Sequence, residues 1–476
     1  MSLIQHGSWL AMPLLLLGAS VLAAGEPTAP RTLRLDYYHT GTATEEYFSL
    51  DRLVVEPLPW PGNPARPIDD THSGKYLFEV HEAASDKLLF SRGFASIYGE
   101  WETTAEATRM HRTFHESLRF PLADPAATLR VVLKKRDAAN AFRQVWEIEI
   151  DPKNPFVDTA HPPKMEVLEF QRRGESSAKV DLLLLGDGYT ASERDKFERD
   201  AQRMIEILFA TSPFKERRDD WNVWGICPPA AASGISRPST GIHRRTPVGA
   251  TYDAFGSERY VLTFENRTWR DIAAWAPYEF VQILVNNATY GGGGIFGLYG
   301  TVAVDNDWAS YIFVHEFGHH FAGLADEYYT SPVAYEPPAQ IVEPWEPNVT
   351  ATIDPEQLKW GDLLTAGVEI PTRWPKEPFE VHAREIRKRR QRIRAERRPE
   401  AEMSALFSEQ QAFESELLGS APHADKVGVF EGANYAPRGF YRSQIDCIMF
   451  TRDQVPFCAA CRRAIERMID LYTSGE

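Results

Sequence analysis

The stretch that most constrains this chain is VHEFGHHFAGLADEYY, residues 314–329, which holds three histidines and three carboxylates. His315 and His319 are four residues apart, so on an α-helix their side chains lie one above the other on the same face. Glu316 is rotated by about 100 degrees around the helix axis and flanks that face. Two imidazoles at this spacing can bind one metal ion, with the glutamate beside it as general base. The stretch therefore predicts a metal-binding helix from about Trp308 to Ala322.

The residues that follow this helix offer a third ligand. Gly323 can end the helix in a left-handed conformation, and Asp326 lies seven residues beyond His319. A carboxylate that returns from such a turn completes three protein ligands and leaves a fourth position for water, which is the open arrangement of a catalytic zinc site. Zinc suits two imidazoles and one carboxylate without a redox role. Glu327, or the distant Glu431 in VGVFEGANY, is the alternative third ligand.

Other side chains are candidates for supporting roles around such a site. His320 is expected to point away from the histidine pair and to be an ordinary hydrogen-bonded residue. Met449, in DCIMFT over a hundred residues downstream, can form a soft floor under the imidazoles, although a methionine on its own is far more often plain core. Candidates for a second donor to the oxyanion of a hydrolytic reaction are Tyr328, Tyr435 and Tyr441.

The N-terminus predicts export. WLAMPLLLLGASVLAA, residues 9–24, is a short apolar run that ends in small residues, the form of a secretory signal peptide; a buried first helix is the alternative. We therefore expect a secreted or periplasmic protein with residues 1–24 removed. No later stretch contains about 18 consecutive apolar residues, so we expect no transmembrane helix. The net charge of -15 argues against a nucleic-acid partner.

The cysteines leave several possibilities. There are four, Cys227, Cys447, Cys458 and Cys461, an even number that makes disulfides plausible in an oxidising compartment. CAAC at residues 458–461 could also be half of a zinc knuckle or a redox pair, but the absence of a second CxxC argues against a knuckle. We expect one disulfide in the C-terminal cluster, with its pairing open.

Two domains are expected, which makes the fold α+β. In KYLFEVH, LRVVLKK and VWEIEID, apolar and polar residues alternate, as in half-buried antiparallel strands, so residues 25–155 predict a β-sandwich. A proline-rich linker follows at 156–176. Residues 177–476 predict an α/β domain that opens with a buried strand, VDLLLLGDGYT, and a capping box, TASE. WNVWGI, YVLTF and FVQILVNN predict further strands. A charged helical insertion near 380–418, basic then acidic, is expected to be a solvated helix.

Several of these segments resemble one family. HEFGHHFAGLADEY resembles the signature of the IgA-peptidase family of metallo-endopeptidases, and so do LLLLGDGYT, WNVWGI, YGGGGI, VGVFEGANY and CIMF with PFCAAC. LRLDYYHTG, SRGFASIYGEW and SLRFPLADP resemble the N-terminal β domain of that family. The resemblance covers nearly all of the mature chain.

The resemblance implies a metzincin-like zinc endopeptidase that acts on protein or peptide substrates. His315, His319 and Asp326 would bind the zinc ion, Glu316 would be the catalytic base, and by analogy Met449 would form the Met-turn. The broader metzincin pattern has its glycine three residues and its third ligand six residues after the second histidine, whereas here Gly323 and Asp326 each come one residue later.

Other readings stay open at this point. The alternatives are a zinc-dependent amidase that acts on cell-wall peptides, and a zinc-stabilised surface protein that binds without cleaving. The glycine-rich YGGGG segment, residues 290–294, could form a cleft rim that pairs with an extended substrate; a flexible loop is the alternative.

Overall fold

The computed structural model describes residues 29–330, 341–453 and 455–473. The expected signal peptide therefore lies outside the described residues. In the described part of the chain, no helix is long and apolar enough to cross a membrane.

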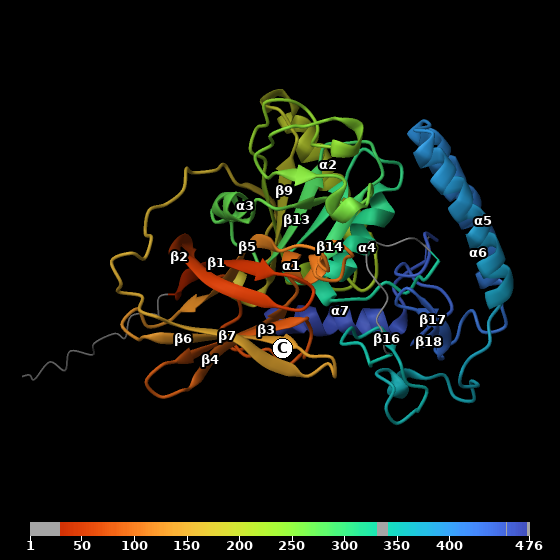
Figure 1. Cartoon of the computed structure of the whole chain (residues 1–476), viewed down its shortest axis with the longest axis horizontal. Helices are drawn as coiled ribbons and strands as arrows, with labels where there is room; N and C mark the ends of the chain where they lie inside the picture. Colours follow the sequence, from red (N-terminus) through yellow and green to blue (C-terminus); the bar gives the residue numbers. More distant parts are fainter. Residues whose placement is uncertain (1–28, 331–340, 454, 474–476) are drawn as a thin grey trace, which may run out of the picture.

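The N-terminal part is the expected β-sandwich (Figure 1). One sheet has the order β2-β1-β5 and the other the order β4-β3-β6-β7. Alternate residues of both sheets, such as Leu35 and Phe120 in one and Val80 and Val131 in the other, form a common core, as expected for two amphipathic sheets packed face to face. The strands are β1 (Arg31–Gly41), β2 (Glu46–Pro59), β3 (Tyr76–Glu82), β4 (Leu88–Phe94), β5 (Arg112–Leu122), β6 (Leu129–Arg136) and β7 (Phe142–Ile150).

The second part is built on a six-stranded sheet with the order β14-β15-β13-β9-β10-β8. Its central strands run parallel and its two edge strands antiparallel. Every residue of β9 is buried, because helices cover both faces of a parallel sheet. The strands are β8 (Leu168–Gln171), β9 (Val180–Asp187), β10 (Trp221–Ile226), β13 (Phe280–Val285), β14 (Gly292–Ile295) and β15 (Tyr299–Ala303).

Helices and two small sheets complete the described structure. The capping box at Thr190 and Glu193 precedes α2 (Arg194–Ala210). The strand expected in YVLTF is shorter, with β12 (Leu262–Thr263) paired to β11 (Ala250–Thr251). The other elements are α1 (Ile97–Trp101), α3 (Asn266–Ala273), α4 (Ala309–Ala322), β16 (Val349–Thr350), β17 (Phe430–Ala433), β18 (Ala436–Arg442) and α7 (Ala459–Tyr472).

The charged insertion differs from the single solvated helix that was expected. It is a pair of helices, α5 (Lys376–Ala395) and α6 (Glu400–Gly419), that lie side by side at one end of the molecule (Figure 1). The chain breaks at Arg397, whose φ is 51°, and at Pro399, because proline lacks the N–H that would continue the helix. Phe379 and Phe407 are buried in the main core, so the pair is anchored by an apolar face.

The N-terminal domain is docked firmly on the second part. Tyr98 and Trp101 of α1 are fully buried in the core that contains the six-stranded sheet. Arg34, buried in the sandwich, contacts Asp271 across the interface with an N···O distance of 2.5 Å. Because apolar packing and a partly buried ion pair both cross the interface, the sandwich is in place to form part of the functional site.

Helix α4 approaches β14 so closely that the strand must be glycine-rich there. A Cβ atom added to Gly294 would lie 2.2 Å from the backbone oxygen of Glu316, and one added to Gly292 would lie 2.6 Å from Ile312. YGGGG is therefore no flexible loop: its last residues form an edge strand against which the HExxH helix is packed.

We predict that Gly294→Ala destabilises the fold by about 1–3 kcal/mol, because the added methyl group meets backbone that cannot rotate away. Gly419→Ala is the matched control, since nothing lies within 4 Å of a Cβ at that position, and alanine is the better helix former. Denaturant unfolding of both variants measures the difference. Equal midpoints for Gly294→Ala and the parent protein would contradict this account of the packing.

Candidate metal centre

The helix end brings the predicted third ligand under the two histidines. Gly323 ends α4 with φ 60° and donates its N–H to the carbonyl groups of Gly318 and His319, and the left-handed conformation reverses the chain. The Asn348 side chain then holds the returning segment, because it accepts from the Ala325 N–H at 2.8 Å and donates to the Ala325 carbonyl at 2.9 Å. Asp326 follows directly and faces back toward the helix.

Three potential ligand atoms converge at this point. Asp326 Oδ1 lies 3.0 Å from His315 Nε2 and 3.2 Å from His319 Nε2. The two Nε2 atoms are 3.2 Å apart. The structure therefore brings together the three residues that the sequence singled out.

The hydrogen bonds of the rings fix which atoms face this point. His315 Nδ1 lies 2.9 Å from the Ile448 carbonyl oxygen, and His319 Nδ1 lies 2.5 Å from that of Leu324. A carbonyl only accepts, so each Nδ1 carries a proton, and a ring in its neutral form then presents its lone pair at Nε2. Two lone pairs and a carboxylate oxygen within 3.2 Å repel one another unless a cation lies among them, so this donor set fits a metal ion.

The acid–base balance of the group agrees with that geometry. Burial alone would raise the pKa of Asp326, but the neighbouring histidines hold it well below its usual range. Burial alone would lower the pKa of His319, but Asp326 outweighs it and raises the pKa to about 9. Both shifts report a pocket that favours positive charge beside the carboxylate.

Polar groups around Asp326 fix its orientation. Tyr435 donates its hydroxyl to Asp326 Oδ2 at 2.6 Å, which leaves Oδ1 directed at the histidines. Arg259 donates to the Tyr328 hydroxyl oxygen at 3.1 Å. Tyr328 and Tyr435 line the same cleft as the histidines, whereas Tyr441 lies in β18 and pairs with Glu431 and Thr350.

The alternative ligands face elsewhere. Glu327 points toward the cysteines of the C-terminal segment, with Oε1 3.4 Å from Cys461 Sγ. Glu431 accepts from Lys376 Nζ at 2.7 Å. His320 lies on the opposite side of α4, where it accepts from the Val281 N–H at 3.2 Å, and burial lowers its pKa to about 3. It is the satisfied polar residue that was expected.

Met449 lies against α4 at Gly318. Its side chain is fully buried, and a Cβ atom on Gly318 would come within 3.1 Å of its sulfur. The Met449 carbonyl accepts from the Glu327 N–H at 2.8 Å. The loop around Met449 thus holds both the helix and the segment that carries Asp326.

The cleft in front of this group has a volume of about 900 Å³. Half-buried Glu316 lines it beside the histidines, together with Gly292 and Gly294 of the edge strand. The opposite wall comes from the N-terminal domain and includes Glu100, Glu102, Arg136, Asp137 and Asn140. Reasoning from the sequence missed this wall, because its residues form no chemical motif; the segment SRGFASIYGEW, which resembles the family, was the one available signal.

The prediction of a disulfide in the C-terminal cluster is wrong. All four cysteines are free thiols in the structure. The sulfur atoms of Cys447 and Cys461 are 3.9 Å apart, whereas a disulfide needs about 2.05 Å. Glu327 lies among the thiols, with its Oε1 3.4 Å from the sulfur atoms of both Cys458 and Cys461.

Comparison with protein families identifies relatives of both domains. Residues 168–469 match the family described as IgA Peptidase M64, and residues 25–147 match the family described as Peptidase M64 N-terminus. No curated protein matches the chain. The first match covers more than half of the sequence and contains the whole candidate centre, and we conclude that the chain belongs to the IgA peptidase M64 family.

Proposed function

We propose that this chain is an exported zinc-dependent endopeptidase in which His315, His319 and Asp326 bind one catalytic zinc ion and Glu316 is the general base. Membership of the family makes the chain a peptidase, and hence a hydrolase with protein substrates. The metal, the base and the export are our proposals. The observation that carries the metal and the base is the convergence of three electron-pair donors within 3.2 Å in an open cleft. The export rests on the apolar run at residues 9–24.

The donor set favours zinc at a catalytic site. Two imidazoles and one carboxylate are typical ligands of zinc in hydrolases, and three protein ligands leave a coordination position for water or substrate. A carbonyl group behind each imidazole fixes the ring and makes its Nε2 a better ligand. Bound here, zinc would supply a Lewis acid that acidifies water and polarises the scissile carbonyl group.

Side chains around the metal would carry out the proton transfers and position the ligand and the substrate. Glu316 follows His315 on the helix and lines the cleft, so it can take a proton from water and pass it to the leaving amine. Tyr435 holds Asp326 in place. Tyr328, whose hydroxyl oxygen already accepts from Arg259, is our candidate donor to the oxyanion.

The shape of the cleft supports an extended peptide as substrate. Strand β14 is an edge strand of the sheet and lines the cleft through Gly292 and Gly294. Gly292 already bonds through its backbone to Arg259 and Val261, so the part of this edge beyond Gly292 is the part to which an extended chain could bind. The sandwich domain forms the opposite wall, so we expect it to contribute to substrate selection.

We predict that Glu316→Gln keeps the fold and the bound metal but lowers kcat on a protein substrate by about 100-fold or more, because the amide cannot accept the proton. Peptide release from casein, followed by mass spectrometry, measures the loss. Glu102→Gln is the control: it removes a carboxylate from the opposite wall of the same cleft and should change kcat by less than about tenfold.

Two outcomes would count against this function. Full activity of Glu316→Gln would exclude the glutamate as base. Cleavage of cell-wall peptides without cleavage of a protein panel would favour the amidase alternative.

We predict that Asp326→Ala weakens zinc binding at the histidines by about tenfold or more, because one of three charged or polar ligands is lost. Glu431→Ala is the control, since that carboxylate binds Lys376 and not the histidines. Zinc titration with a competing chelator measures both affinities. A chelator should also abolish peptidase activity, and added zinc should restore it; equal affinities in the two variants would rule out Asp326 as ligand.

A further inference from the structure

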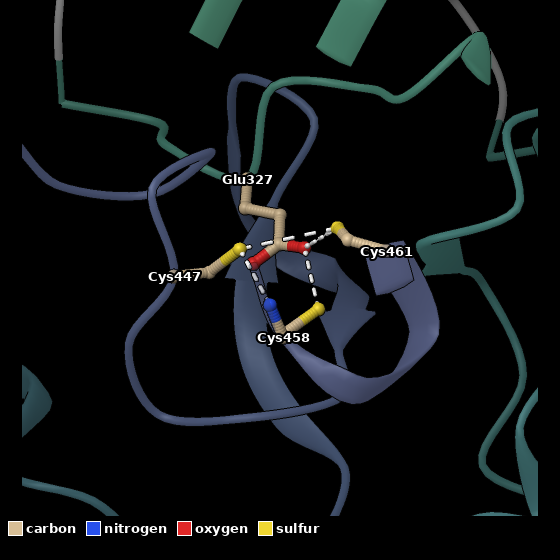
Figure 2. Close-up of side chains that lie close together, drawn as sticks. All are labelled: Glu327, Cys447, Cys458 and Cys461. Atoms are coloured by element: carbon tan, nitrogen blue, oxygen red, sulfur yellow. Dashed lines mark hydrogen bonds between the residues drawn. The ribbon is translucent and has the colours of Figure 1, made fainter. Parts of the chain in front are cut away.

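A second group of metal-ligand side chains lies on the far side of the Asp326 segment. Cys447, Cys458, Cys461 and Glu327 point toward one another (Figure 2). All four are at least 98 % buried. They come from three separate segments: the turn after α4, the loop that contains Met449, and the first turn of α7 with the residue before it.

The distances fit a tetrahedral metal site better than a disulfide. A zinc ion with Zn–S bonds of about 2.3 Å places two sulfur ligands about 3.8 Å apart, and a sulfur and an oxygen ligand about 3.5 Å apart. Cys447 and Cys461 Sγ are 3.9 Å apart, and Glu327 Oε1 lies 3.4 Å from both Cys458 and Cys461 Sγ. The CxxC motif supplies two ligands, Cys447 supplies a third, and the carboxylate of Glu327 supplies the fourth.

Hydrogen-bond donors surround the sulfur atoms. The backbone N–H groups of Cys458 and Met449 point at Cys447 Sγ at 3.2 and 3.4 Å. The Ser443 hydroxyl lies 3.1 Å from Cys458 Sγ. Such donors stabilise thiolates and are typical of the surroundings of metal ligands.

The charges around the group also point to a bound cation. Glu327 is fully buried, and its Oε1 accepts from Asn348 Nδ2 at 3.0 Å. Its Oε2 has no hydrogen-bond partner among the described residues, and leaving such a buried polar atom unpaired is costly. Arg442 is fully buried as well and donates to backbone carbonyls of Gly432 and Ile445. Its charge can balance part of the negative charge that three thiolates and a carboxylate would leave on a divalent ion.

We propose that Cys447, Cys458, Cys461 and Glu327 bind a second zinc ion in a closed, structural site. Four protein ligands fill a tetrahedral shell and leave no position for substrate. None of the three thiols lines the wide cleft, so a metal ion bound to them would have no contact with substrate there. The site is distinct from the histidine centre and does not depend on the function proposed for that centre.

The proposed site ties together the parts that hold the histidine centre. Glu327 follows Asp326 directly, and Cys447 precedes Ile448, whose carbonyl accepts from His315. Cys458 and Cys461 add the start of α7, which packs against α4. A metal here would fix the Asp326 segment and the Met449 loop to one helix, because structural zinc sites contribute directly to folding stability.

Metal counting tests the proposal. We expect purified protein loaded with zinc under reducing conditions to hold two zinc ions per chain. The double variant His315→Ala/His319→Ala should keep one, and Cys458→Ser/Cys461→Ser should lose the other. Cys227→Ser is the matched control, since Cys227 lies beside Gly186 of β9 and outside the group, and it should keep both.

X-ray absorption on the zinc-loaded histidine double variant identifies the ligands without disturbing the cysteines. We expect sulfur neighbours at about 2.3 Å from zinc. A chelator should also lower the Tm of this variant, because it removes the zinc ion, which binds only the folded state. A histidine double variant that binds no zinc, a spectrum with nitrogen and oxygen neighbours alone, or a disulfide among these cysteines in a peptide map of the reduced-purified protein would each overturn the proposal. Loss of peptidase activity in Glu316→Gln with both zinc ions present would leave it standing.

Discussion

The centre of this structure depends on the convergence of two imidazole lone pairs and one carboxylate oxygen. Each Nδ1 faces a backbone carbonyl, so each Nε2 presents a lone pair to the shared point. Such a group is unfavourable without a cation, and neighbouring residues hold it in place. The left-handed Gly323 turns the chain, Asn348 fixes the returning segment, and Tyr435 orients the carboxylate. A proton can satisfy the group in part; a divalent ion with an open coordination position satisfies it and supplies reactivity.

Two adjacent carboxylates then take opposite directions. Asp326 faces the histidines across the cleft floor, and Glu327 faces three thiols in the interior. Successive side chains of an extended segment point to opposite sides, so one short segment can serve two sites. The loop around Met449 repeats this pattern: the Ile448 carbonyl supports His315, while Cys447 belongs to the thiol group. The parts that hold the two groups are therefore the same backbone segments.

The N-terminal sandwich belongs to the active region rather than to a separate module. Helix α1 is buried in the core of the second domain, and residues beside it form one wall of the cleft. The insertion α5–α6 is anchored by apolar side chains at the opposite end of the α/β domain (Figure 1). The walls of the cleft thus come from segments that are more than a hundred residues apart in sequence.

The sequence by itself determined the HExxH helix, its glycine end and the candidate role of Asp326, because helical spacing and a left-handed turn are local properties. It also determined the alternating strands of the sandwich and the buried strand β9, since periodicity is local too. Only the tertiary structure decided that Glu327 faces away from the histidines, that YGGGG is an edge strand pressed against α4, and that the charged insertion is an anchored pair of helices. The tertiary structure also showed that the four cysteines are free thiols and form no disulfide. Three of them lie with Glu327 in a potential metal site. The physical reason is that these outcomes depend on contacts between distant segments, and the direction of a side chain across such a contact is set by packing and not by its sequence neighbours.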